Sequence, residues 1–166
     1  EDRRFYSHSG VDATSIMRAA LGNILAGDIQ SGASTLTMQL VKNIFVQRSL
    51  YLPTEQEREE AYRQAVATEF DRKLNEMKLA IGLEKRFSKE EILEAYLNIA
   101  PFGGNTYGIQ AASQRYFDKI AQTLTPAEAA SLIAIVQYPT TRNLSSPSNY
   151  EANQARRDVI LGSMRA

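Results

Sequence analysis

Charged side chains are concentrated at the start of the chain. Two carboxylates, two guanidinium groups and the only histidine lie within residues 1–8, ahead of a helix start at Asp12. Carboxylate and imidazole groups are the usual proton donors and acceptors in enzymes. A solvated, charged N-terminal segment explains the same composition, because charge runs usually lie on a protein surface.

A second polar segment spans residues 32–43 and combines small residues with hydrogen-bond donors. Ser34 and Thr35 lie at a predicted helix start that Ser34 can cap, and the free backbone N–H groups there suit an anion. Three polar residues follow at helical spacing: Gln39, Lys42 and Asn43. They could present donors on one face of the helix, although an ordinary capped amphipathic helix explains them better when this segment is taken alone.

The third segment places two cations and a carboxylate within five residues. Glu76 follows Arg72 by four residues and Lys73 by three, so all three share one helical face. An intrahelical ion pair accounts for this spacing without any function.

Helices are the elements that must position these residues. Asp12 can cap a helix that runs to about Ala26, with Gly27 just past its end. Pro53 and Thr54 introduce a long charged helix over residues 55–86. Its apolar stripe, at steps of four and three, is expected to pack on a core: Val66, Phe70, Leu74, Met77 and Ile81.

The rest of the chain also reads as helical. Capping signals mark two further starts: Ser88 with Glu91, and Thr125 with Pro126 and Glu128. A last helix is predicted over residues 151–164, whereas residues 101–108 and 139–147 read as loops, where functional residues often lie. No segment alternates apolar and polar residues convincingly, so the sequence predicts a single mainly α domain.

Composition narrows the class of protein. The chain has 166 residues, of which 43% are hydrophobic and 23% charged, and 19 basic residues balance 19 acidic ones. This composition fits a folded globular domain, and its balanced charge gives no overall positive field that would attract nucleic acid. There is no cysteine, and the longest apolar stretch, residues 127–136, is too short to span a bilayer. The sequence begins in mid-motif without Met, so we expect an excerpt of a longer, anchored chain.

The order of the motifs is more informative than any one of them. They are Glu1-Asp-x-x-Phe-x-x-His-x-Gly, Gly-x-Ser-Thr-x-Thr-x-Gln-x-x-Lys-Asn, Arg72-Lys-x-x-Glu76 and Ile92-Leu-Glu-x-Tyr-Leu-Asn98. This set resembles the signature of glycosyltransferase family 51, the peptidoglycan glycosyltransferases. That family includes monofunctional enzymes and the first catalytic domain of class A penicillin-binding proteins. The likeness continues to Met164 and covers nearly the whole chain.

The chain departs from the family pattern at three places. Ala33 replaces a second Gly and Met38 stands where Gln is common. Residues 51–68 read as an insertion before the third motif, which is similar to the bifunctional synthases of actinobacteria. The insertion leaves open whether Arg48 matches the family's phosphate-contacting arginine.

The resemblance implies both a fold and a reaction. The fold would be a mainly α, lysozyme-like domain over residues 1–166, with a catalytic cleft and a smaller membrane-facing subregion. The reaction would join lipid II units into β-1,4-linked glycan by inverting transfer, with release of polyprenyl pyrophosphate. Such a displacement needs a base on one side and stabilisation of the leaving group on the other.

The resemblance also implies roles for particular residues. Glu1 matches the family's catalytic base, and Glu76 its second glutamate, with a supporting role near the phosphates. The pyrophosphate would be bound by donors and cations at these positions: Ser34, Thr35, Gln39, Lys42, Asn43, Arg72 and Lys73. No cofactor is expected to be required; Mg²⁺ or Mn²⁺ could bridge pyrophosphate oxygens, but no metal-ligand spacing is present. His8 is expected to be structural.

The expected partners follow from the amphiphilic substrate. They are lipid II, the growing glycan strand and the membrane surface, but no nucleic acid. A transpeptidase domain could follow in the parent protein, which would act at the outer face of the bacterial cytoplasmic membrane through an anchor absent from this chain. The apolar residues 44–46 and 50–52 could dip into the membrane interface, or form a buried helix end. Moenomycin, which mimics the lipid-linked donor, is expected to inhibit.

Three other classes of function remain at this stage. A lysozyme-like or lytic hydrolase of peptidoglycan would also be α-rich and use carboxylates, but it would have no pyrophosphate to hold. A non-catalytic scaffold that binds lipid precursor would be expected to lack the two glutamates. A soluble helical adaptor would not explain the ordered motifs.

Overall fold

The computed structural model describes residues 2–26, 33–66 and 70–165. Two compact units divide the chain, Glu1–Tyr96 and Leu97–Ala166, and the division falls within one helix, α5 (Lys89–Ile99). The described residues form helices and short 3-10 turns, and their one β-type contact is an isolated bridge between Pro101 and Tyr107. The mainly α class predicted from the sequence is therefore confirmed.

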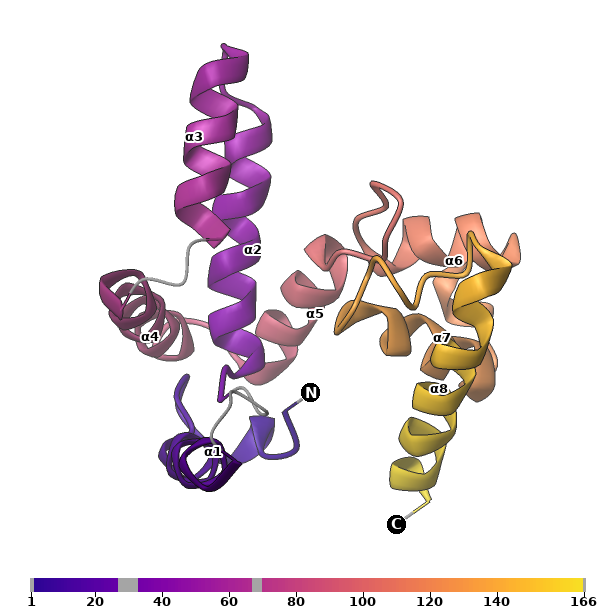
Figure 1. The fold of residues 1–166 in the computed structure, drawn as a ribbon, viewed down its shortest axis with the longest axis horizontal. Helices are drawn as coiled ribbons and strands as arrows, with labels where there is room; N and C mark the ends of the chain where they lie inside the picture. Colours follow the sequence, from indigo (N-terminus) through magenta and orange to yellow (C-terminus); the bar gives the residue numbers. More distant parts are fainter. Residues whose placement is uncertain (1, 27–32, 67–69, 166) are drawn as a thin grey trace. The chain divides into compact units, whose positions relative to one another are not determined.

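The first unit contains a 3-10 turn, Phe5–Ser7, and four complete helices: α1 (Ala13–Ala26), α2 (Leu36–Leu50), α3 (Glu55–Val66) and α4 (Phe70–Glu84). Its core cluster is formed by Met38, Val41 and Ala80, which join α2 to α4. In Figure 1, α3 lies alongside α2 and α4 runs in a different direction from both. Because α2 packs on both α3 and α4, it is the central element of this unit.

The predicted start of α1 is confirmed. The Asp12 carboxylate accepts a hydrogen bond from the backbone N–H of Ser15 at 3.1 Å, which satisfies one of the free donors of the first turn. The Arg4 guanidinium pairs with the same carboxylate, with Nε 3.0 Å from Oδ2. This pairing holds the pKa of Asp12 well below its usual range. Gly27, predicted just past the helix end, lies outside the described residues.

The cap of α2 differs from the prediction by one residue. Thr35 is the N-cap: its backbone is extended and its hydroxyl accepts from the N–H of Met38 at 3.2 Å. Ser34 lies one position too early for this bond, and its hydroxyl instead accepts from Lys73 Nζ at 2.5 Å.

The single long helix predicted over residues 55–86 is wrong. The described residues form two helices, so the stripe that ran through both is broken. Val66, Leu74 and Ile81 are 37%, 46% and 38% exposed, and the Phe70 side chain lies outside the description. The buried face of α4 instead contains Glu76 and Ala80, because the carboxylate of Glu76 finds basic partners within the fold.

The second unit packs α7 (Pro126–Val136) against α8 (Tyr150–Met164), with α6 (Ile109–Phe117) beside α7. Its buried side chains include Leu132 and Ile135. The buried amide of Asn153 donates to the carbonyls of Ser131 at 2.9 Å and Arg142 at 2.8 Å, which fixes the loop before α8. The capping box predicted at Ser88 is present in the first unit. The helix start predicted at Thr125 is present in the second unit, and it too forms a capping box.

Among the described helices, none combines the length and the apolar character needed to cross a bilayer.

Candidate active site

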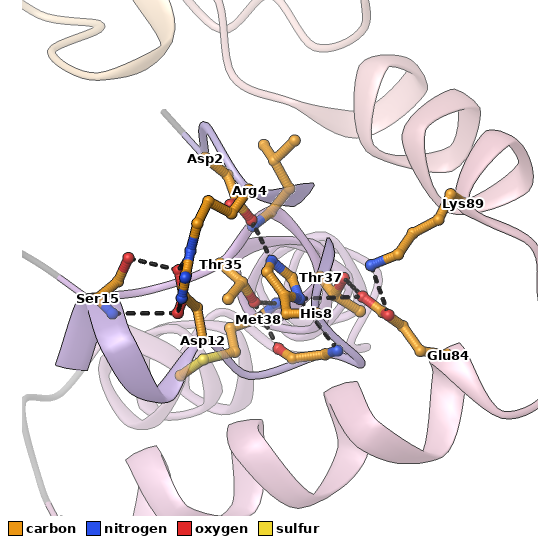
Figure 2. A network of polar contacts seen from close by, with 12 residues as sticks. Asp2, Arg4, His8, Asp12, Ser15, Thr35, Thr37, Met38, Glu84 and Lys89 are labelled. Atoms are coloured by element: carbon orange, nitrogen blue, oxygen red, sulfur yellow. Dashed lines mark hydrogen bonds and ion pairs between the residues drawn. The ribbon is translucent and has the colours of Figure 1, made fainter. Parts of the chain in front are cut away.

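The N-terminal segment is tied to the start of α2 by Asp2. Its Oδ2 atom accepts a hydrogen bond from the backbone N–H of Leu36 at 3.0 Å and lies 2.9 Å from Nε2 of His8 (Figure 2). Leu36 is the first residue of α2, and a carboxylate is stabilised at the positive end of a helix. The helix start therefore holds an anion, as its sequence suggested, but that anion belongs to the protein.

The hydrogen bonds of His8 define its tautomer. The backbone N–H of Gly10 donates to Nδ1 at 3.2 Å, so Nδ1 acts as an acceptor. The ring proton is then on Nε2 and is donated to Asp2. With 6% of its side chain exposed and both nitrogens engaged, His8 links backbone segments, in line with the structural role expected for it.

A second carboxylate, Glu84, completes this buried polar network. Its Oε1 accepts from the hydroxyl of Thr37 at 2.5 Å, and its Oε2 lies 2.6 Å from Nζ of Lys89. The same ammonium group lies 4.5 Å from the centre of the Phe5 ring. Figure 2 shows Glu84 reaching toward His8 from α4, and the closest pair of atoms is 3.9 Å apart. Glu84 thus connects the N-terminal segment, α2 and the start of α5.

A separate cluster surrounds Glu76 on α4. This side chain is almost fully buried, and both of its oxygens meet cations: Arg72 at Oε1, and Lys73 at Oε2, 3.0 Å away. Lys73 also donates to Ser34, so the segment before α2 is brought against α4. The pairing between Glu76 and the two basic residues matches the shared helical face predicted from their spacing.

Lys42 adds a third cation to this cluster. Burial, followed by the charge of Arg72, lowers the pKa of Lys42. Burial also lowers the pKa of Lys73, with smaller contributions from Arg72 and Lys42. Arg72, Lys73 and Lys42 are therefore half-buried cations that lie near one another, and the first two pair with buried Glu76. Cations held close together in this way attract an anion, because it would relieve both their repulsion and their lost hydration.

The remaining predicted site residues differ in what they can offer a ligand. Thr35 is buried, and its hydroxyl donates to the carbonyl of Gly10 at 2.6 Å while capping α2. Gln39 accepts a hydrogen bond from the Tyr96 hydroxyl at 3.0 Å. Asn43 is half-buried one turn further along α2. Glu1 lies outside the described residues, although its neighbour Asp2 is firmly held.

A groove opens from the cation cluster. Its volume is about 830 Å³, and α2, α3 and α4 all contribute to its walls. The lining residues are Phe45, Arg48, Ser49, Leu52, Ala61, Arg63, Gln64, Ala65, Asp71, Arg72, Asn75 and Glu76. Arg72 and Glu76 therefore belong both to the groove and to the cluster.

Comparison with known proteins identifies the family. The family model described as "Transglycosylase" matches residues 1–165, and the chain belongs to that family. Over 164 residues it is 43% identical to penicillin-binding protein 1F of Bacillus subtilis and 40% identical to penicillin-binding protein 1A of Neisseria gonorrhoeae. Each alignment covers 99% of this chain, but 20% and 18% of the two relatives, so the chain spans about a fifth of their length. The resemblance inferred from the motifs is confirmed, and the chain is a glycosyltransferase domain.

Sequence reasoning did not single out Glu84 or Lys89. Glu84 follows Glu76 by two helical turns, so its position on the same side of α4 could have been read from the spacing. Its partners Thr37 and Lys89 come from other helices, and no local pattern indicates that contact.

Proposed function

We propose that this domain polymerises lipid II into β-1,4-linked glycan strands by inverting transfer, with release of polyprenyl pyrophosphate. The observation that carries the proposal is a cluster of three cations on the described part of α2 and α4. Arg72 and Lys73 pair with buried Glu76, Lys42 lies near both of these cations, and the cluster offers positive charge to a pyrophosphate. Family membership supplies the reaction type.

In this proposal Glu1 is the general base. It removes the proton from the 4-hydroxyl of the acceptor sugar as that oxygen attacks the anomeric carbon of the donor. Asp2 supports this role, because its bonds to Leu36 and His8 anchor the residue next to Glu1. General-base catalysis of this kind contributes about 10²–10⁴ to a rate.

The cluster around Glu76 would act on the leaving group. Negative charge grows on the pyrophosphate as the bond to the anomeric carbon breaks, and cations already in place stabilise it without reorganisation. Glu76 positions Arg72 and Lys73 for this purpose. Ser34 accepts a hydrogen bond from Lys73 and so helps to position it. Gln39 and Asn43 contribute polar groups along α2. Thr35 caps the N-terminus of that helix.

We propose that no metal ion is required, although Mg²⁺ or Mn²⁺ could still bridge pyrophosphate oxygens. Both oxygens of Glu76 are already paired with cations of the protein, so this carboxylate offers little to Mg²⁺ or Mn²⁺. We assign the positive charge at the pyrophosphate to the basic side chains.

The proposal includes contact with a membrane surface. Ile44, Phe45, Leu50 and Tyr51 are 45%, 44%, 44% and 83% exposed around the C-terminal half of α2. Arg48 lies among them and could reach lipid headgroups. This supports the interfacial alternative over a buried helix end. We place the reaction at the outer face of the cytoplasmic membrane, in a parent protein with a transpeptidase domain.

The decisive experiment compares Lys42→Ala with Lys78→Ala. Lys78 is exposed on α4 and provides a matched loss of charge outside the cluster. Lys42→Ala should weaken binding of lipid II at least tenfold, whereas Lys78→Ala should not change it. Equal affinity in the two variants would contradict the phosphate role of Lys42.

The same preparation separates synthesis from hydrolysis. Supplied with lipid II or with finished glycan, the unaltered chain should consume only lipid II and release polyprenyl pyrophosphate. Cleavage of finished glycan without polymer growth would instead identify a hydrolase.

A further inference from the structure

The groove beside the cation cluster is lined by both charged and apolar side chains. Arg72 and Glu76 line it, and the pyrophosphate is proposed to bind there. Its walls also include apolar side chains from two segments: Phe45 and Leu52 before and after the end of α2, and Ala61 and Ala65 on α3. A site that combines charged and apolar walls fits an amphiphile.

Helix α3 forms part of the groove wall. It belongs to residues 51–68, which read as an insertion in the family pattern, and most of its side chains are exposed. Two small side chains differ: Ala65 is buried, Ala61 is half-buried, and both line the groove. The small side chains at these two positions leave the space that larger ones would fill.

We propose that α3 and the C-terminal half of α2 bind the first isoprene units of the donor's polyprenyl chain. The inference rests on the proposed function, because it takes the pyrophosphate to lie at Arg72. The hydrocarbon leaves the phosphate end and follows the wall formed by Phe45, Leu52, Ala61 and Ala65. Arg48 and Arg63 line the same groove and add positive charge near the phosphates. Helix α3 thereby gives the enzyme a preference for prenylated over bare pyrophosphate.

The test measures dissociation constants for two probes, inorganic pyrophosphate and farnesyl pyrophosphate, the latter below the concentration at which it forms micelles. The ratio of the two constants isolates the contribution of the hydrocarbon. Burial of two methylene groups is enough for about a tenfold preference, so the unaltered chain should bind farnesyl pyrophosphate at least tenfold more tightly.

Two variants of α3 should move this ratio in opposite directions. Ala61→Gln places a polar side chain in the apolar wall and should reduce the preference about tenfold. Gln64→Leu adds apolar surface to the groove and should increase it severalfold. The controls are Tyr62→Gln and Gln56→Leu, which make comparable changes at exposed positions of α3 outside the groove and should leave the ratio unchanged.

The outcomes separate this inference from the function on which it rests. If inorganic pyrophosphate binds and Lys42→Ala weakens it, but Ala61→Gln and Gln64→Leu behave like their controls, the role of α3 is wrong and the phosphate site stands. If inorganic pyrophosphate does not bind at all, the phosphate site fails and the inference fails with it. Because Gln64→Leu predicts a gain, misfolding cannot imitate the expected result.

Discussion

Two polar clusters lie in the first unit, and they differ in charge balance rather than in burial. The carboxylates of Asp2, Glu84 and Glu76 are all nearly inaccessible, with 5%, 3% and 4% of their side chains exposed. Asp2 and Glu84 meet backbone, hydroxyl, imidazole and ammonium groups, and of these only the Lys89 ammonium is a full positive charge. Glu76 instead pairs with Arg72 and Lys73, and burial together with neighbouring cations lowers the pKa of Lys42 and Lys73.

This difference supports a role in the fold for the first cluster and, as proposed, a role in ligand binding for the second. A network with more carboxylates than cations does not favour an added anion, whereas a group of half-buried cations does. Burial alone would have assigned both clusters the same role. The sign of the nearby charge is therefore the better guide to the proposed substrate site.

The largest expected effect comes from Glu1, the proposed base, and it is compared with that of Asp2, its neighbour in the network around His8. Glu1→Gln should reduce the rate of polymerisation by about 10²–10⁴ while lipid II still binds, because only the base is removed. Asp2→Ala should instead destabilise the fold by about 1–2 kcal/mol, since the N-terminus of α2 loses its carboxylate. Single-turnover kinetics and thermal unfolding distinguish the two. A Glu1→Gln variant with full activity would remove Glu1 from the mechanism.

Local signals in the sequence were sufficient for the helix starts. The capping boxes at Ser88 and Thr125 and the cap at Asp12 involve residues three apart, so their hydrogen bonds form wherever the helix forms. The cap of α2 was displaced from Ser34 to Thr35 because Lys73, 39 residues away, engages Ser34. A local pattern cannot register such a contact.

Contacts between distant segments limited the prediction of the site. The spacing of Arg72, Lys73 and Glu76 in the sequence was enough to predict that they share one helical face. Lys42 lies near them only because α2 packs on α4, which the sequence did not indicate. The division into α3 and α4 was missed because residues 55–86 carry a helical pattern throughout. The groove between these helices was consequently missed as well.

The second prediction contrasts Glu84→Gln with Glu76→Gln. Glu84→Gln leaves the largely buried ammonium of Lys89 without its carboxylate and should lower the free energy of unfolding by about 3 kcal/mol. Glu76→Gln should cost less, because 20% of the Arg72 side chain and 40% of the Lys73 side chain are exposed to solvent. Chemical denaturation of both variants measures the difference.

Added inorganic pyrophosphate sharpens this contrast. It should raise the unfolding temperature of Glu76→Gln, whose cations are then even less balanced, because a ligand that binds only the folded state stabilises it. Pyrophosphate should raise the unfolding temperature of Glu84→Gln by no more than it raises the unfolding temperature of the unaltered chain. If both variants gained equally, the two clusters would not differ in the way their charges suggest.

The smallest effect concerns an ion pair in the second unit, which differs from both clusters because its carboxylate is only partly buried, with 21% of the Glu128 side chain exposed. Lys119 Nζ lies 2.6 Å from the Glu128 carboxylate, and this hydrogen bond, followed by those from Thr125, lowers the pKa of Glu128 from 4.5 to about 2. A pKa that is lower in the folded state stabilises the fold above 4.5, and that contribution is lost as the pH falls toward 2.

Lys119→Met removes the largest cause of this shift, so the pKa of Glu128 in the variant should lie closer to 4.5. The variant should unfold at a slightly lower temperature than the unaltered chain at neutral pH. The difference should shrink as the pH falls and vanish only below the folded-state pKa of about 2, where Glu128 is protonated in both. Lys78→Met, which removes an exposed charge on α4, should show no such pH dependence. If the difference between Lys119→Met and the unaltered chain persisted at the acidic end, packing of the Lys119 side chain would be responsible, and such pairs would contribute to this fold independently of their charge.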